Sequence, residues 1–237
     1  SPNINIFRDP RWGRGMETYG EDPFLQARLG TAFVRGMQGD DPERLKVAAC
    51  AKHFAVHSGP EALRHEFDAI APKRDLYETY LPAFEALVKE GVECVMCAYN
   101  RVDGQPACGD DFLLQDLLRD QWEFKGHVVS DCWAIDDFYK NHKVAKDAAT
   151  SAAWALRAGT DLNCGAAFNA LPEALDKGLI AEEDIDAALR RLLATKMKLG
   201  FFDSGTRWGS LGDEVVEADE HVALAREAAQ KSIVLLK

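Results

Sequence analysis

Residues 94–131 read CVMCAYNRVDGQPACGDDFLLQDLLRDQWEFKGHVVSD, and this stretch decides the fold. It begins with an apolar run at residues 94–99 and ends with a second one at residues 127–131. Such short, continuously apolar runs are typical of strands buried on both faces. Between them, residues 110–121 carry leucines at helical spacing. Strand, helix and strand in this order predict a parallel βαβ unit.

The same alternation of short apolar runs and longer amphipathic ones continues on both sides of this unit. Further strands are predicted at residues 3–7, 47–54 and 160–163, and further helices at residues 22–37, 73–90, 144–158 and 183–199. In the last of these helices the apolar side chains line one side, and Gly200 ends it. The regular order predicts a parallel α/β sheet, built either as a doubly wound sheet or as a (β/α)8 barrel.

Two observations favour a TIM-like (β/α)8 barrel over a doubly wound sheet. Neither G-x-G-x-x-G nor G-x-x-x-x-G-K-[ST] joins a strand to a helix, so the nucleotide-binding versions of the doubly wound fold lose support. Polar residues directly follow the predicted strands, where barrel enzymes carry their chemistry. They are Arg8, Asp9, Lys52, His53, Tyr99, Asn100, Asp131, Asp161 and Asn163. Five predicted strands are fewer than the eight of a closed barrel, so we expect an incomplete barrel whose early strands precede Ser1.

The last part of the chain differs in character from the rest. Residues 205–211 are polar and rich in glycine, and residues 221–237 have a helical pattern that runs into an apolar segment. Both ends read as interior, because the first residues resemble a strand and the last ones are apolar. We therefore expect a barrel domain at residues 1–203 and, at residues 204–237, a linker that begins a second domain.

Composition and charge argue against several kinds of partner. The chain has a formal net charge of -11, whereas proteins that bind nucleic acids or anionic membranes need a basic face. It contains no run of about 18 apolar residues, so no transmembrane helix is expected, and no signal peptide is visible. A neutral substrate such as a sugar is compatible with this charge.

Six cysteines are too few for a disulfide scaffold in a chain of 237 residues. Cys94 and Cys97 form C-x-x-C, a spacing used for zinc or redox chemistry, but in a strand positions three apart point to opposite faces. Cys97 and Cys108 flank a turn, and Cys132 and Cys164 lie near the ends of predicted strands. Either pair could form a disulfide in an oxidising compartment, and the sequence leaves the state of both open.

Asp131 stands at the end of an apolar strand in the string VVSDCW. A carboxylate at such a place costs free energy to bury unless it is paired or hydrogen-bonded. Two interpretations fit the spacing about equally. Asp131 caps the next helix, since aspartate favours that position, or it is a catalytic group.

Lys52 and His53, in the string AKHF, stand at the end of another strand. They offer several hydrogen-bond donors to substrate hydroxyls, or they are a surface pair in a loop. His57, His65 and Glu66 follow and raise the question of a metal site. Their spacing matches no H-E-x-x-H or comparable ligand pattern, so no metal is expected.

The string DPRWGR places Arg8, Arg11 and Arg14 around Trp12. Arginine forks bind carboxylates or neighbouring oxygens through two hydrogen bonds, and tryptophan faces stack on ligands. The alternative is a structural loop in which Arg11 or Arg14 pairs with the acidic side chains of residues 17–22. Taken together with the other motifs, the ligand-binding interpretation is favoured.

These motifs resemble glycoside hydrolase family 3. The resemblance lies in four strings in the same order, SPNINIFRDPRWGRGMETYGEDP, AKHF, VMCAYNRVDGQPAC and GHVVSDC, and the closing SIVLLK resembles the start of the family's second domain. A single string of this kind is weak evidence, because chance alone can produce it, but four strings in the same order are specific to the family. The resemblance implies a (β/α)8-type barrel followed by an α/β sandwich domain of the same parent chain.

The resemblance also implies a reaction and a set of site residues. The reaction is hydrolysis of terminal, non-reducing β-D-xylosyl or β-D-glucosyl residues of oligosaccharides, with retention of configuration through double displacement. Asp131 is implied as the nucleophile, and Arg14, Lys52 and His53 as ligands of the sugar hydroxyls, with Tyr99 close to the nucleophile. Arg14 and Lys52 would favour the ionised form of Asp131. No cofactor is implied. The string HSGPEALRHEF and the S-D-C motif favour the β-xylosidase branch, but they leave xylose and glucose both open.

The chain departs from the family pattern at the acid/base group. In most of the family this is a glutamate of the second domain, so we assign no acid/base residue to this chain. Some relatives use an Asp-His pair after the K-H-F strand, but the loop here has His57 and His65 and no D-x-H. The barrel piece alone is expected to be unstable or inactive, because one side of its sheet is unfinished.

Two other classes of function compete with the hydrolase. One is a relative that transfers the glycosyl group to phosphate or another acceptor, but no basic cluster beyond Arg14 and Lys52 supports it. The other is an inactive carbohydrate-binding relative, which would not need the intact Asp131 motif. A periplasmic or extracellular location is expected from the family and from the two candidate cysteine pairs.

Overall fold

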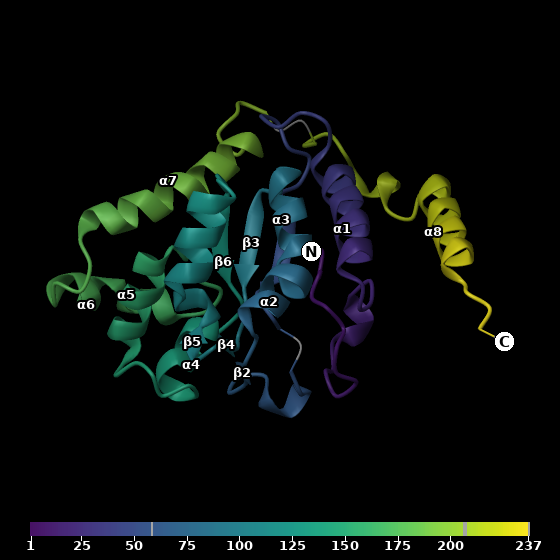
Figure 1. Ribbon diagram of the computed structural model, residues 1–237. Helices are drawn as coiled ribbons and strands as arrows, with labels where there is room; N and C mark the ends of the chain where they lie inside the picture. The colour runs from purple at the N-terminus through teal and green to yellow at the C-terminus, as the bar shows by residue number, and fades with distance from the viewer. Residues whose placement is uncertain (58, 206–207, 237) are drawn as a thin grey trace. The chain divides into compact units, whose positions relative to one another are not determined.

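Three parallel strands form the main sheet of the computed structural model, which describes residues 1–57, 59–205 and 208–236. The sheet order is β1 (Cys50–Phe54), β3 (Cys94–Cys97) and β6 (His127–Ser130), and both pairings are parallel. Figure 1 shows β3 and β6 side by side at the centre of the molecule. The strands thus follow one another across the sheet in chain order, and they are parallel, as the alternation of strands and helices predicts.

The two remaining predicted strands flank this sheet, each through a single bridge. Asn3 pairs with Lys52 of β1, and Leu162 pairs with Val129 of β6, both in parallel. Five chain segments therefore lie in order, and the α/β fold class is confirmed. Within the residues that the structure describes, the strands form an open array and not a closed barrel.

Helical segments follow each of the parallel strands, as the sequence pattern predicts, and the last of them come after the bridge at Leu162. They are α1 (Pro23–Gln38), α2 (Lys73–Asp75), a π-helical segment (Leu76–Tyr80), α3 (Pro82–Lys89), a second π-helical segment (Phe112–Gln121), α4 (Ala134–Lys140), α5 (Ala148–Ala158), α6 (Leu171–Asp176), α7 (Glu182–Lys198) and α8 (Asp219–Ser232). The predicted helices 22–37, 73–90, 110–121 and 183–199 agree to within a few residues. The predicted helix 144–158 begins later, at Ala148, and the predicted helix 221–237 ends at Ser232.

Side-chain caps set the start of two of these helices. The Asp22 carboxylate accepts a hydrogen bond from the Phe24 amide, 2.8 Å away, at the start of α1. Asp147 accepts from the Thr150 amide at 2.8 Å and begins α5 four residues after Val144, which explains the late start. Gly159 ends α5 with a φ of 112°, a backbone conformation that a residue with a Cβ adopts only at a cost.

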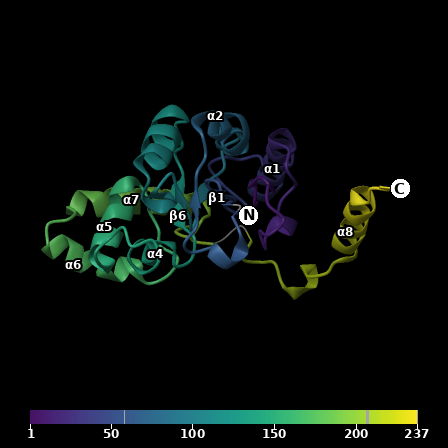
Figure 2. The ribbon, with the colours of Figure 1, turned by 60° about the horizontal axis from the view of Figure 1, so that its bottom comes forward.

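The core lies between the sheet and the helices that cover it. Buried side chains of α3 include Phe84 and Leu87, and the segment Phe112–Gln121 buries four leucines against the strands. Figures 1 and 2 show α1 on one side of the strands and α5, α6 and α7 on the other. Burial of these apolar faces fixes the sheet and so positions the loops at the carboxyl ends of its strands.

Several short elements escaped the sequence analysis. A small second sheet joins β2 (Asp68–Ala69), β4 (Arg101–Val102) and β5 (Gln105–Pro106). The hairpin between β4 and β5 turns at Asp103 and Gly104, which have φ values of 48° and 87°. An Asp-Gly pair with positive φ at both positions is the favoured two-residue hairpin turn.

The structure contains both disulfides that the sequence left open. Cys97 is bonded to Cys108, and Cys132 to Cys164. Cys94 instead faces Cys50 of the neighbouring strand, with 3.0 Å between the two sulfur atoms. The two cysteines of the C-x-x-C motif therefore have different partners, Cys108 for Cys97 and Cys50 for Cys94. This agrees with the strand geometry, in which positions three apart point to opposite faces.

The chain divides into two compact units, Ser1–Leu199 and Gly200–Lys237. The first unit holds both sheets and the helices up to α7, and the second holds α8. The predicted loop at residues 205–211 lies partly outside the described residues. None of the described helices is long and apolar enough to cross a membrane.

Candidate active site

Asp131 lies directly after β6, at the carboxyl end of the parallel sheet. Its amide donates to the Cys97 carbonyl at 3.0 Å, which extends the β3–β6 pairing to the end of the strand. Its carboxylate Oδ1 accepts from the Cys132 amide at 2.8 Å, and the residue is 7% exposed. Trp133, not Asp131, holds the N-cap position of α4, so the helix-cap interpretation of Asp131 is wrong.

The second carboxylate oxygen of Asp131 faces cationic and aromatic nitrogen groups. Oδ2 lies 3.4 Å from His53 Nε2 and 4.0 Å from Arg14 Nη1. It is buried, and it makes no hydrogen bond of regular geometry. One oxygen of Asp131 is thus anchored by the backbone, while the other lacks a hydrogen-bond partner.

The pKa of Asp131 results from opposing effects. Burial raises it, and this is the largest effect, while the Cys132 amide, the Arg14 guanidinium, the Tyr99 hydroxyl and the Lys52 ammonium lower it. The sequence analysis expected Arg14 and Lys52 to favour the ionised form, and the direction of their effect is as expected. The net pKa is nevertheless raised, because desolvation outweighs them.

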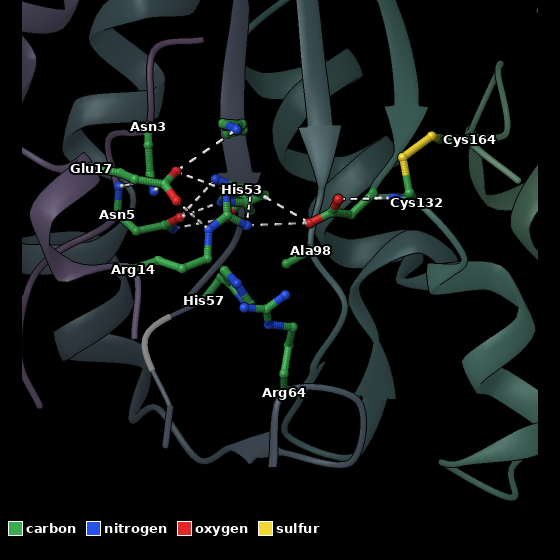
Figure 3. A network of polar contacts seen from close by, with 12 residues as sticks. Asn3, Asn5, Arg14, Glu17, His53, His57, Arg64, Ala98, Cys132 and Cys164 are labelled. Atoms are coloured by element: carbon green, nitrogen blue, oxygen red, sulfur yellow. Dashed lines mark hydrogen bonds and ion pairs between the residues drawn. A yellow bond between two sulfur atoms is a disulfide. The ribbon is translucent and has the colours of Figure 1, made fainter. Parts of the chain in front are cut away.

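Arg14 is held from three directions. Its Nε and Nη2 donate to the two carboxylate oxygens of Glu17 at 2.6 and 2.7 Å, a bidentate pair. Its Nη1 lies 3.0 Å from His53 Nε2 and also faces Asp131. Figure 3 shows Arg14 between the Glu17 carboxylate and the His53 ring. The pairing of Arg14 with an acidic side chain of residues 17–22 is therefore confirmed, while its binding of a ligand stays a prediction.

Glu17 contacts several polar side chains near β1. Besides Arg14, it meets Lys52, whose Nζ is 4.0 Å from Glu17 Oε2, and the Asn3 amide at 3.4 Å. The sequence analysis named Glu17 only as a structural partner of the arginines. Its role as the acid shared by Arg14 and Lys52 depends on contacts between distant segments, which the spacing of the motifs does not contain.

His53 is completely buried behind Arg14. Its Nδ1 lies 3.1 Å from Asn5 Oδ1, and burial, followed by the nearby His57 and Arg14, holds its pKa well below the usual value. The ring is therefore neutral. Asn5, which is 2% exposed, was not among the predicted site residues.

Tyr99 lies just after β3, next to the two histidines of the loop that follows β1. Burial raises the pKa of Tyr99 to about 12, and the negative charge of Asp131 adds to the effect, so its hydroxyl stays protonated. Its ring lies 5.9 Å from the His57 ring and 4.7 Å from the His65 ring, centroid to centroid. The prediction that Tyr99 lies near Asp131 agrees with their mutual effect on pKa.

The two histidines of the loop after β1 have separate partners. His57 Nδ1 lies 3.2 Å from Asn100 Oδ1, and burial lowers the pKa of His57 to about 3. His65 Nδ1 lies 2.8 Å from Asp137 Oδ2 of α4. His65 thus pairs with an acid that no local D-x-H spacing could reveal. Among the described residues no group of three His, Cys, Asp or Glu side chains is arranged to hold a metal ion.

Other polar residues that follow the strands have structural partners. Arg8 donates to the Tyr80 hydroxyl at 2.7 Å. Asp161, whose side chain is fully buried, pairs with Arg119 and Arg191, with 2.8 Å between the paired atoms in each case. A polar residue at the end of a predicted strand is therefore not always a candidate site residue, since some of these residues form structural pairs.

The arrangement as a whole has a definite chemical character. A buried carboxylate with one free oxygen stands among donors at the carboxyl end of a parallel sheet, where α/β enzymes bind and convert their substrates. Arg14 and Lys52 supply cationic donors, and Tyr99 supplies a neutral hydroxyl. Fold and site together define an α/β domain with a cluster of hydrogen-bond donors around a buried carboxylate at the carboxyl end of its parallel strands.

The chain belongs to glycosyl hydrolase family 3. Its residues 1–195 match the family model described as the glycosyl hydrolase family 3 N terminal domain. The resemblance inferred from the four sequence strings is thereby confirmed.

The relatives are glycosidases. Over the whole chain, 48% of residues are identical to those of a xylan 1,4-beta-xylosidase of Xylanibacter ruminicola, of which the match covers 28%. A solved GH3 exo-beta-xylosidase, XlnD, in complex with a xylobiose aziridine activity-based probe, is 37% identical with a TM-score of 0.92 over all of this chain and 32% of that one. The beta-glucosidase of Listeria innocua is also 37% identical, with a TM-score of 0.92 over all of this chain and 34% of that one. The chain thus spans about a third of the length of these relatives.

Proposed function

We propose that the protein is a retaining exo-β-glycosidase that removes terminal, non-reducing β-D-xylosyl residues, or β-D-glucosyl residues, from oligosaccharides. The observation that carries the proposal is the free Oδ2 of Asp131, buried beside Arg14 and His53 at the end of β6. The relatives named as xylosidases and glucosidases support the substrate class.

In the proposed reaction Asp131 Oδ2 attacks the anomeric carbon and forms a glycosyl ester while the bond to the leaving oxygen breaks. A carboxylic acid outside this chain gives its proton to the leaving oxygen. The same group then takes a proton from water, whose oxygen attacks the anomeric carbon and releases Asp131 as a carboxylate. Two inversions at one carbon give overall retention.

Arg14, Lys52 and Tyr99 are proposed to surround the sugar, with the buried His53 behind Arg14. Arg14 and Lys52 are cationic donors for its hydroxyls, and they also favour the ionised nucleophile. Tyr99, protonated throughout the neutral range, donates to Asp131 and orients it. Neither step of the reaction requires a metal or a cofactor.

The open sheet is proposed to be part of a (β/α)8-type barrel that comprises residues 1–203. Residues 204–237 are proposed as a linker that begins a second domain. Relatives about three times as long as this chain support that arrangement. Two disulfides support an oxidising compartment, so we place the protein in the periplasm or outside the cell.

The test is hydrolysis of 4-nitrophenyl β-xyloside and β-glucoside by the full-length protein, with NMR detection of the first anomer released. We expect the β-anomer first, and the ratio of the two kcat/KM values identifies the preferred sugar. No release from either substrate would reject the hydrolase. A glycosyl phosphate that forms only when phosphate is present would favour the glycosyl-transferring alternative.

A further inference from the structure

The side-chain amide of Asn5 makes two hydrogen bonds to the backbone of His53, one through its oxygen and one through its nitrogen. Its Oδ1 accepts from the His53 amide at 2.7 Å, and its Nδ2 donates to the His53 carbonyl at 2.8 Å. A backbone N–H only donates and a carbonyl only accepts, so these two bonds fix which end of the Asn5 amide is oxygen. Figure 3 shows the Asn5 side chain beside the His53 ring.

The fixed amide determines the tautomer of His53. The Asn5 oxygen lies 3.1 Å from His53 Nδ1 and carries no hydrogen, so the hydrogen of this contact must be on Nδ1. His53 is fully buried, and burial lowers its pKa well below the usual value, so the ring carries one hydrogen and not two. Its Nε2 is consequently a bare lone pair.

The lone pair on Nε2 in turn orients Arg14. Arg14 Nη1 lies 3.0 Å from Nε2, and a guanidinium can only donate, so Arg14 donates to His53. The two other bonds of Arg14, to Glu17, leave its guanidinium little freedom to rotate. The result is a guanidinium whose Nη1 is held 4.0 Å from Asp131 Oδ2.

The opposite tautomer would change the contacts of the nucleophile. A hydrogen on Nε2 would meet the hydrogens of Arg14 and would point instead to Asp131 Oδ2, which is 3.4 Å away. Asp131 Oδ2 would then accept a hydrogen bond from a neutral ring, and Arg14 would lose its third anchor. A carboxylate oxygen that accepts such a bond is a weaker nucleophile.

We propose that Asn5 is a positioning residue that holds His53 as the Nδ1–H tautomer, so that His53 anchors Arg14 and leaves Asp131 Oδ2 free for attack. The effect on catalysis rests on the proposed function, whereas the tautomer itself does not. Asn5 touches neither Asp131 nor Arg14 in the contacts above, and it acts through His53.

The tautomer is tested directly by ¹⁵N NMR of the full-length protein with labelled histidines, the His53 signals being assigned by their loss in His53→Gln. We expect a protonated Nδ1 and an unprotonated Nε2 in the wild-type protein. A protonated Nε2 would overturn the proposal, whether or not the protein hydrolyses glycosides. This measurement needs no Asn5 variant to fold.

The consequence for the reaction is tested with Asn5→Asp. A carboxylate beside Nδ1 stabilises the imidazolium form, so His53 gains a second hydrogen at Nε2, which faces Arg14 and Asp131. The other titratable side chains that face His53 are Lys52 and His57. We expect kcat to fall about 10- to 100-fold at low pH, as for the loss of a hydrogen bond to a charged group, and to recover as rising pH removes the added proton.

Gln38→Glu is the matched control. Gln38 is a buried amide that donates to the Gly91 carbonyl at 2.9 Å and accepts from the amides of Ala49 and Glu93, so it undergoes the same chemical change away from His53. Destabilisation alone would lower the activity of both variants without a new ionisation. An Asn5→Asp variant with the pH profile of the wild type would overturn the proposal, and an inactive wild-type protein would reject the proposed function instead.

Discussion

At the residue scale, the proposed reaction requires that Asp131 be ionised although it is buried. Burial raises its pKa, and four neighbouring donors lower it, among them the Tyr99 hydroxyl. A carboxylate that must act as a nucleophile loses activity as pH falls through its pKa. The activity on the acid side therefore reports directly on these donors.

Tyr99→Phe removes one of the donors and raises the pKa of Asp131. The acid limb of the kcat/KM profile should move to higher pH by on the order of one unit, since a unit corresponds to about 1.4 kcal/mol, close to the contribution of a hydrogen bond to a charged group. Tyr139→Phe is the control, because the Tyr139 hydroxyl donates to the Asp136 carboxylate at 3.3 Å instead. A limb that stays in place in Tyr99→Phe would contradict the role of Tyr99.

The residue scale also marks the limit of prediction from the sequence. Asp131, Lys52 and Tyr99 were found because each directly follows an apolar run. Asn5 and Glu17 were missed as site residues, because their roles arise from contacts with His53 and Lys52 across tens of residues of chain. A motif shows which residue types are present, whereas only the fold shows which of them share a hydrogen bond.

At the element scale, Asp161 connects three elements around β6. Its carboxylate pairs with Arg119 of the segment Phe112–Gln121 and with Arg191 of α7, and it accepts from the Val128 amide at 2.8 Å. Burial lowers the pKa of Arg119 to about 10, so the guanidinium remains charged at neutral pH. These bonds fix the sheet edge on which the Asp131 loop rests.

Asp161→Asn leaves both arginines without their anionic partner. Breaking a buried pair from one side costs about 3–5 kcal/mol, so urea unfolding should show a correspondingly lower stability. Asp186→Asn is the matched control, because Asp186 lies on the exposed face of α7, the helix that carries Arg191. Its Oδ2 is 4.0 Å from Arg190 Nη2. This substitution should cost no more than about 0.5 kcal/mol. Equal losses in the two variants would refute the structural role of Asp161.

The disulfide Cys132–Cys164 joins the residue after Asp131 to the segment that bridges β6. Its cysteines are 32 residues apart, so the chain-entropy relation predicts that Cys132→Ala with Cys164→Ala costs about 3–4 kcal/mol. Thermal unfolding without reductant measures the cost, with Cys50→Ala as the control that removes a thiol but no cross-link. An unchanged midpoint in the double variant would show that the bond does not stabilise this loop.

Elements with strong periodicity were predicted well, and short ones were not. The strands β1, β3 and β6 and the helices α1 and α7 follow from apolar patterns in their own residues. By contrast, α4 has seven residues, and its N-cap is Trp133 in a left-handed conformation, so no capping signal precedes it. The outer predicted strands, residues 3–7 and 160–163, are represented in the structure by the single bridges of Asn3 and Leu162.

At the scale of the whole molecule, the described sheet is open on both sides. Asn3 and Leu162 each pair through one bridge, and no further strand among the described residues pairs beyond either of them. Residues 1–237 produced alone should therefore aggregate or lack activity, as measured by light scattering and glycoside hydrolysis. A monomer that melts cooperatively and hydrolyses the β-xyloside would contradict this expectation.

The central claim is that Asp131 forms a covalent bond with the sugar, and trapping tests it most directly. The full-length protein is incubated with 2,4-dinitrophenyl 2-deoxy-2-fluoro-β-xyloside, whose fluorine slows hydrolysis of the glycosyl ester, and the labelled peptide is sequenced by mass spectrometry. We predict one fluoroxylosyl group on Asp131, retained in Asp136→Asn and absent in Asp131→Asn. A label on Asp136 or Asp137, or turnover without any label in Asp131→Asn, would contradict the account.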